Sequence, residues 1–168
     1  MIRLPRRPAR HLALLALATG VLLAPAAPAS AAAPVVDLNC TITVTTDINP
    51  PLTPRLQNHA FVSHGLTGTA NCTGTVDGNT VTGPGSFAIS DQVVSDCTQA
   101  HGAGTFVLKI PTTSGTKTVT GRFTVVAVAG TTVSSGDIAG TATVISADGD
   151  CVTTPITSAT AVITAHVT

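Results

Sequence analysis

From Gly104 to Val125, apolar and polar residues alternate with a period of two. This period puts successive side chains on opposite faces of an extended chain, so it predicts two amphipathic β-strands. A two-residue turn at Ser114-Gly115 would join the strands as a β-hairpin. The resulting register sets three pairs opposite each other on the apolar face: Phe106 with Phe123, Leu108 with Gly121, and Ile110 with Val119.

A second hairpin is predicted at Asp77-Gly78, because Asp-Gly is among the dipeptides best suited to a two-residue turn. The apolar faces of the two flanking segments then agree. The predicted opposite pairs are Leu66 with Ile89, Gly68 with Phe87, and Ala70 with Gly85.

A short unit of glycine, any residue and an apolar residue recurs along the chain, and successive copies are separated by 17, 19, 17 and 19 residues. Its glycines are Gly68, Gly85, Gly104, Gly121 and Gly140. Each interval fits one strand and one short connection, so neighbours along the chain should pair as an antiparallel meander. We therefore predict an all-β fold of about eight strands, and favour a β-barrel over a two-sheet sandwich.

Two stretches interrupt this alternation. Thr46 to His59 contains Pro50, Pro51 and Pro54, and proline cannot donate a hydrogen bond to a sheet, so we predict a long exposed loop. Asp91 to Gly102 is predicted as a second irregular stretch.

The first residues have the character of a secretory leader. Four arginines lie within the first ten residues, an apolar run from Leu12 to Leu23 follows, and Ala29-Ser30-Ala31 fits a cleavage site. We predict a signal peptide over residues 1–31 and a single secreted β-domain over residues 32–168. The expected location is extracellular.

Removal of this leader changes the charge of the chain. All eight acidic residues lie at Asp37 or later, but only four of the eight basic residues remain, which gives a formal net charge of −4. With no basic patch or stripe, the domain is not expected to bind nucleic acid or an anionic membrane. Its partner or ligand is predicted to be extracellular, and the sequence does not identify it.

Four cysteines in an exported chain predict two disulfides. We favour Cys40–Cys72, because both residues fall on the apolar face of a predicted strand, and Cys97–Cys151, because both fall in loop-like sequence. Zinc is the alternative, but no two cysteines have the close spacing typical of a zinc site.

The segments GTFVLKI, VTGRFTV, SGDIAGTATV and DGDCVTTPIT resemble those of small secreted β-rich proteins of actinobacteria. The resemblance covers most of the chain after the leader. It implies an exported β-domain, and because that group has no established activity, it transfers no functional residue.

Candidate residues for chemistry are few. His59, His64 and His101, with Asp91 and Asp96, could form a metal site or an acid–base pair, but their spacing matches no motif, and solvated loop histidines are the preferred interpretation. Asp148-Gly149-Asp150 is interpreted as a hairpin turn in preference to a calcium loop. We predict no catalytic residue, metal or cofactor, and the sequence assigns no ligand-binding residue.

The function favoured by the sequence is therefore a non-enzymatic domain for extracellular binding, adhesion or envelope interaction. The alternatives are a secreted protease inhibitor, for which Leu52 to Leu56 would be the reactive loop, and a small-ligand carrier. An ordinary connection is the preferred interpretation of that loop. A carrier requires an apolar cavity inside the barrel, whereas an interaction module would have a filled interior.

Overall fold

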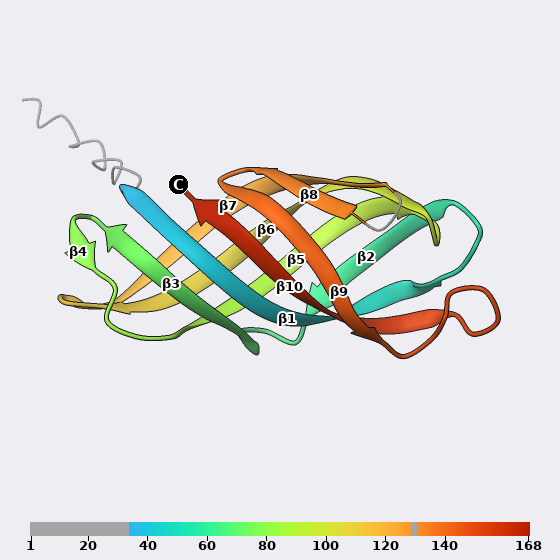
Figure 1. Cartoon of the computed structure of the whole chain (residues 1–168), viewed down its shortest axis with the longest axis horizontal. Helices are drawn as coiled ribbons and strands as arrows, with labels where there is room; N and C mark the ends of the chain where they lie inside the picture. Colours follow the sequence, from blue (N-terminus) through green and yellow to red (C-terminus); the bar gives the residue numbers. More distant parts are fainter. Residues whose placement is uncertain (1–33, 129–130) are drawn as a thin grey trace, which may run out of the picture. The chain divides into compact units, whose positions relative to one another are not determined.

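The computed structural model describes residues 34–128 and 131–168, which form ten β-strands. The predicted signal peptide over residues 1–31 lies outside the described residues. The strands, labelled in Figure 1, are β1 (Val36–Leu52), β2 (Gln57–Ser63), β3 (Gly68–Val76), β4 (Asn79–Thr80), β5 (Gly85–Ser95), β6 (Gln99–Thr112), β7 (Gly115–Val128), β8 (Thr131–Gly136), β9 (Ile138–Ala147) and β10 (Ile156–Val167).

All strands belong to one antiparallel sheet that closes into a ring. From β5 to β10 each strand pairs with the next, and β10 closes the ring by pairing with β1. Between β1 and β5 the sheet is completed by two strands placed end to end. β3 pairs with the first part of β1 and β2 with its later part, and both also pair with β5. The prediction of an all-β antiparallel meander is confirmed, and the single closed sheet agrees with the preference for a barrel over a two-sheet sandwich. The described residues include no helix that could span a membrane.

The β6–β7 hairpin forms where the alternation predicts it, but its register differs by two residues. Thr113 and Ser114 make the turn, and Thr112 pairs with Gly115. Gly115 has a φ of 106°, and its carbonyl accepts a hydrogen bond from Oγ1 of Thr112 at 2.7 Å. A glycine tolerates this backbone conformation, so it serves as the first residue after the turn instead of lying within it.

The corrected register places Phe106 opposite Gly121 and Gly104 opposite Phe123. A Cβ atom at position 121 would lie 2.6 Å from Cε1 of Phe106, so Gly121 leaves the space that the aromatic ring occupies. The three predicted pairs are therefore wrong, since Phe106 lies opposite Gly121, Leu108 opposite Val119 and Ile110 opposite Lys117. A shift of two residues preserves the face of each side chain, which is why the predicted apolar face is still the inner face.

The Asp77-Gly78 turn is confirmed, with Val76 opposite Asn79. Two of the predicted pairs across this hairpin also form: Gly68 with Phe87, and Ala70 with Gly85. The third, Leu66 with Ile89, does not, because the chain leaves the sheet between β2 and β3. Ser63 replaces Leu66 there, and its Oγ accepts a hydrogen bond from the backbone N–H of Ile89 at 3.0 Å.

Both predicted irregular stretches are mostly strand. β1 continues to Leu52 and β2 begins at Gln57, so only residues 53–56 connect them. The prolines are tolerated because Pro50 and Pro51 fall where the β1–β10 register is interrupted, between Asp47 and Leu52. Likewise β5 continues to Ser95 and β6 begins at Gln99, which leaves a turn over residues 96–98.

Large apolar side chains fill one half of the ring interior. Their inward positions alternate along each strand, as the period of two requires. Phe87 and Phe106 stack there with their ring centroids 6.0 Å apart. The other fully buried apolar residues of this packed half include Leu38, Ile42, Leu108, Ile110, Val119 and Val167.

Both predicted disulfides are confirmed. Cys40 and Cys72 lie directly opposite each other on β1 and β3, and their side chains belong to the packed half. Cys97 and Cys151 join the turn between β5 and β6 to the loop between β9 and β10. Two disulfides are compatible with an extracellular protein.

Candidate ligand-binding cavity

The other half of the ring encloses a cavity of about 180 Å³. Its wall is almost entirely apolar and is formed by residues of β1, β2 and each strand from β5 to β10. Val44 of β1, Phe61 of β2, Val93 of β5, Phe123 and Val125 of β7 and Ile163 of β10 line it.

The cavity exists because the inward positions at this end carry small side chains. Alanine occupies five of them: Ala100, Ala127, Ala142, Ala159 and Ala161. At the packed end the corresponding positions carry phenylalanine, leucine and isoleucine, which extend far enough to meet across the ring. A closed sheet fixes the diameter of the interior, so small side chains leave space that the backbone cannot remove by collapsing.

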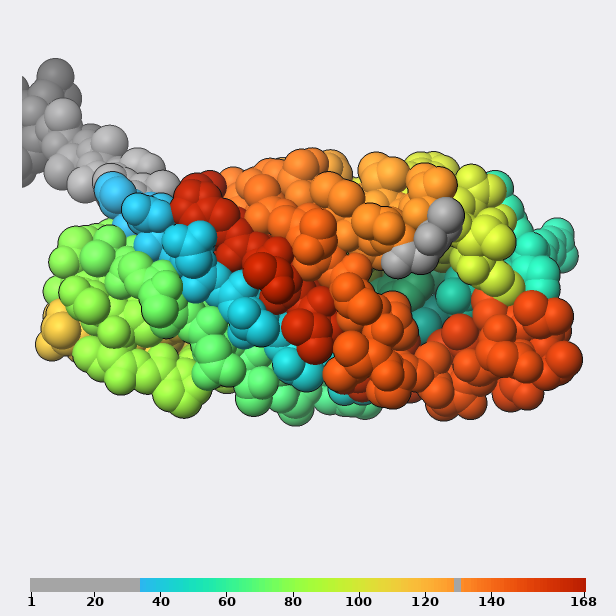
Figure 2. Space-filling view, in the orientation of Figure 1, coloured from blue at the N-terminus to red at the C-terminus, as the bar shows by residue number. Residues whose placement is uncertain are grey.

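The wall of the cavity is incomplete between β8 and β9. Those strands pair only from Thr132 opposite Ala142 to Ser134 opposite Gly140, while β9 continues to Ala147 beside β10. Val144 lies in this continuation, lines the cavity, and is 60% exposed. Figure 2 shows the surface hollowed between β9 and the segment where β5 turns into β6, so the cavity has a side through which a ligand can enter.

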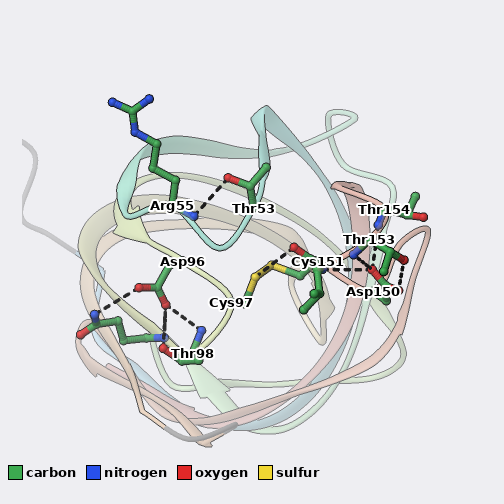
Figure 3. Close-up of a disulfide and its surroundings, with 11 residues drawn as sticks. Thr53, Arg55, Asp96, Cys97, Thr98, Asp150, Cys151, Thr153 and Thr154 are labelled. Atoms are coloured by element: carbon green, nitrogen blue, oxygen red, sulfur yellow. Dashed lines mark hydrogen bonds between the residues drawn. A yellow bond between two sulfur atoms is a disulfide. The ribbon is translucent and has the colours of Figure 1, made fainter.

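The end of the ring next to the cavity is crossed by the Cys97–Cys151 disulfide (Figure 3). The two loops that carry it are each organised by an aspartate. Oδ1 of Asp96 accepts a hydrogen bond from the backbone N–H of Thr98 at 2.7 Å. This bond and those from the side chains of Thr98 and Gln99 hold the pKa of Asp96 at about 2. Figure 3 shows Thr53 and Arg55, from the connection between β1 and β2, at the same end of the ring.

Asp150 organises the loop on the other side of the disulfide. Its Oδ1 accepts the backbone N–H groups of Val152, Thr153 and Thr154 at 3.0, 2.7 and 2.8 Å. Hydrogen bonds from Thr153 and Thr154 hold its pKa well below the usual range, and Asp148, bonded to Thr157 and Ser158, is shifted in the same direction. Both carboxylates thus stabilise the connection between β9 and β10, which agrees with the predicted hairpin turn.

Asp91 is the one titratable side chain in the wall of the cavity, as far as the described residues show. It lies on β5 between Phe61 of β2 and Gly104 of β6 and is only 9% exposed. Burial raises its pKa to about 7, although hydrogen bonds from the backbone N–H groups of Asp91 and Phe61 act in the opposite direction. Its Oδ1 has no hydrogen-bond partner among the described residues.

Gly104 provides the space in which this carboxyl group lies. A Cβ atom at position 104 would be 2.5 Å from Cβ of Asp91 and 2.7 Å from Cζ of Phe123. Any larger residue would therefore have to displace Asp91, Phe123 or the backbone carbonyl of Ser90, which is also 2.7 Å away.

The structure separates the candidate residues named from the sequence. Asp91 belongs to a buried strand and Asp96 to an exposed turn, so they form no joint site. His64 is exposed, and its Nε2 lies 2.8 Å from Oδ2 of Asp47. His101 is exposed on β6. Within residues 34–128 and 131–168, no group of three histidine, cysteine or acidic side chains is placed to hold a metal ion.

His59 contradicts the interpretation of the histidines as solvated. It lies on β2, is 1% exposed, and its Nδ1 donates a hydrogen bond to the carbonyl of Pro50 at 2.7 Å. The other ring nitrogen, Nε2, has no partner in the part of the chain described. The error has the same origin as the predicted loop, since the prolines concealed the strand that buries this side chain.

The sequence contains a signal for Asp91 in its strand alternation and not in any motif. Phe87, Ile89, Asp91, Val93 and Ser95 continue one inward-facing alternation along β5. A carboxylate at an inward position of a strand is unusual, because burial of an unpaired charge is unfavourable.

No protein-family model, curated protein or solved structure matches the chain, so the resemblance to secreted actinobacterial proteins stays a prediction.

Proposed function

We propose that this protein is a secreted carrier or binding domain that holds a small, largely apolar ligand in the cavity of the ring. The observation that supports this function is the cavity itself: about 180 Å³, with an apolar wall and a gap between β8 and β9. Cavities of about 150 Å³ lined by apolar side chains bind benzene. The ligand should therefore be as small as a single six-membered ring or a short alkyl chain.

Stability also favours a binding role. An empty apolar cavity of this size that is closed to solvent destabilises a fold by roughly 4 kcal/mol, at about 24 cal/mol per Å³, and this value is the upper bound for a cavity open on one side. The other half of the same ring has large side chains at the equivalent positions and is filled. A ligand that occupies the cavity would recover part of that free energy, and its binding would stabilise the folded state.

Binding without catalysis is the better proposal for this cavity. Catalytic sites generally combine several positioned polar groups, such as a nucleophile with a base and an oxyanion-stabilising donor. The described wall has a single carboxyl group and three hydroxyl-bearing residues, Thr46, Thr132 and Ser134. Export, as the leader and the disulfides predict, fits a domain that collects or delivers a small molecule outside the cell.

The test is binding of toluene to the ¹⁵N-labelled protein, followed by backbone amide shifts in NMR spectra. We expect shifts concentrated in residues that line the cavity. Ala142→Leu fills the cavity from β9 and should weaken binding by about tenfold or more, because little space remains for a ring of this size. Ala139→Leu, at an exposed position of the same strand, is the matched control and should bind like the native protein.

Two results would overturn the proposal. One is an absence of toluene-dependent shifts at cavity residues in the native protein. The other is that a folded Ala142→Leu variant binds toluene as tightly as the native protein does, because a ligand in the cavity must compete with the added side chain.

A further inference from the structure

The carboxyl group of Asp91 is the least explained feature of the cavity. It is nine-tenths buried, faces an apolar wall, and leaves Oδ1 without a partner among the described residues. Buried polar groups are normally satisfied by a hydrogen bond, and buried charges by a counter-ion. The cavity therefore contains an acceptor that the protein leaves unpaired.

A second unpaired oxygen lies in the same wall. Oγ of Ser134, on β8, is buried and has no partner within the described residues. Ser134 and Asp91 reach the cavity from β8 and β5, with β6 and β7 between these strands in the sheet. The wall thus offers oxygen acceptors from two strands and, among the described residues, no nitrogen donor from a side chain.

The charges on neighbouring strands do not supply a counter-ion for Asp91. On β2 the inward titratable residue is His59, whose Nδ1 is bonded to Pro50. Most other charged or titratable groups on the strands around the cavity alternate to the outer face: Asp37 and Asp47 on β1, His101 and Lys109 on β6, Arg122 on β7, and His166 on β10. Lys117 of β7 has the inward parity, but it lies opposite Ile110 at the packed end and its Nζ pairs with Oδ2 of Asp77 at 3.3 Å. No described residue therefore brings positive charge to Asp91, so that charge must come from the ligand.

We propose that the ligand is a small amine, whose ammonium group pairs with Asp91 while its apolar body fills the cavity. This inference depends on the proposed function. An ammonium group has three N–H donors and a positive charge, so it can pair with the carboxylate of Asp91 through a charge-assisted hydrogen bond. A neutral carbonyl or ether could accept only from a protonated Asp91, which is the form that is lost as the pH rises through a pKa of about 7.

The pairing has a definite dependence on pH. With no ligand, burial places the pKa of Asp91 at about 7, so below this pH the carboxyl group must lose its proton to solvent before it can pair with an ammonium ion. Affinity for an amine should fall by about tenfold for each pH unit below 7, since proton and ligand compete for one group. A neutral acceptor ligand would show the opposite trend.

The experiment compares three probes of nearly equal shape: benzylamine, benzyl alcohol and toluene. Their dissociation constants are measured by NMR titration of the native protein at pH 8 and pH 5. We expect benzylamine to bind about tenfold to a hundredfold more tightly than toluene at pH 8, the range of a charge-assisted hydrogen bond. That preference should be lost at pH 5.

Asp91→Asn should abolish the preference for benzylamine but retain toluene binding, which also shows that the variant is folded with its cavity intact. Asp47→Asn removes an exposed carboxylate from β1 and is the matched control, with no change expected. Equal binding of benzylamine and toluene by the native protein, or a tighter complex with benzyl alcohol at pH 5, overturns the inference but leaves the proposed function standing. Failure of all three probes to bind overturns both.

Discussion

Single residues determine where this ring is full and where it is hollow. Gly121 lies under the ring of Phe106 and Gly104 lies beside Asp91, and in both places a Cβ atom would collide with the neighbouring side chain. The alternation predicted from sequence gives the correct face for these residues. It does not give their partners, because a shift of two residues leaves every face unchanged.

Asp91 should make the stability of the protein depend on pH. Its pKa is raised from 3.8 to about 7, so the folded state holds a proton that the unfolded chain has lost between these values. The unfavourable contribution of Asp91 is therefore largest above pH 7, decreases as the pH falls, and disappears below about pH 4.

We expect Asp91→Asn to gain stability relative to the native protein on going from pH 4 to pH 8, by about 4 kcal/mol. Urea unfolding of both proteins across this range, monitored by far-ultraviolet circular dichroism, measures the difference. A difference that does not change with pH would mean that Asp91 is ionised in the folded protein at pH 5. Asp47→Asn provides the comparison for an exposed carboxylate.

At the scale of strands and turns, the sequence predicts more of the paired structure than of the connections. Asp77-Gly78 forms the expected turn because both residues adopt positive φ values, 51° and 73°. Aspartate and glycine tolerate such values better than most residues. The prolines after Asn49 do not mark a loop, because interruption of the β1–β10 register accommodates them. That interruption depends on strands more than one hundred residues apart, which local sequence cannot reveal.

The two disulfides should differ in their effects on the cavity. Cys40–Cys72 joins neighbouring strands within the packed half, whereas Cys97–Cys151 joins two connections and crosses the end of the ring (Figure 3). With a sequence separation of 54 residues, the second bridge also restricts the unfolded chain more than the first, whose separation is 32.

Replacement of both Cys97 and Cys151 by serine should lower the free energy of unfolding by about 4 kcal/mol in the chain-entropy description. It should also weaken toluene binding, because the loops that close the cavity are no longer joined. Replacement of Cys40 and Cys72 by alanine serves as the comparison. It should lower stability but leave the affinity of the folded protein for toluene unchanged, and equal losses of affinity in the two variants would contradict this division of roles.

For the whole molecule, closure of the sheet is what turns a pattern of small residues into a cavity. Each alanine is unremarkable in its own strand, and the signal appears only when Ala100, Ala127, Ala142 and Ala161 are placed together in the wall of one half of a closed ring. The strand order and the β1–β10 pairing are needed for that placement. The sequence therefore predicts a closed sheet but not which half of its interior is empty.

Two alanines on β10 allow a test of this division between a packed half and a hollow half. Ala161 and Ala165 lie on the same face of the strand, but Ala161 lines the cavity and Ala165 is 6% exposed within the packed half. Ala161→Leu should raise the free energy of unfolding by about 1–2 kcal/mol, because the added methylene groups enter empty apolar space. Ala165→Leu should lower it by about 1–3 kcal/mol, because the added atoms displace packed neighbours. Denaturant unfolding of the two variants measures both effects, and a decrease for Ala161→Leu as large as that for Ala165→Leu would show that the interior is packed throughout. Opposite signs, accompanied by loss of toluene binding in Ala161→Leu alone, would locate the ligand in the half of the ring that the protein leaves unfilled.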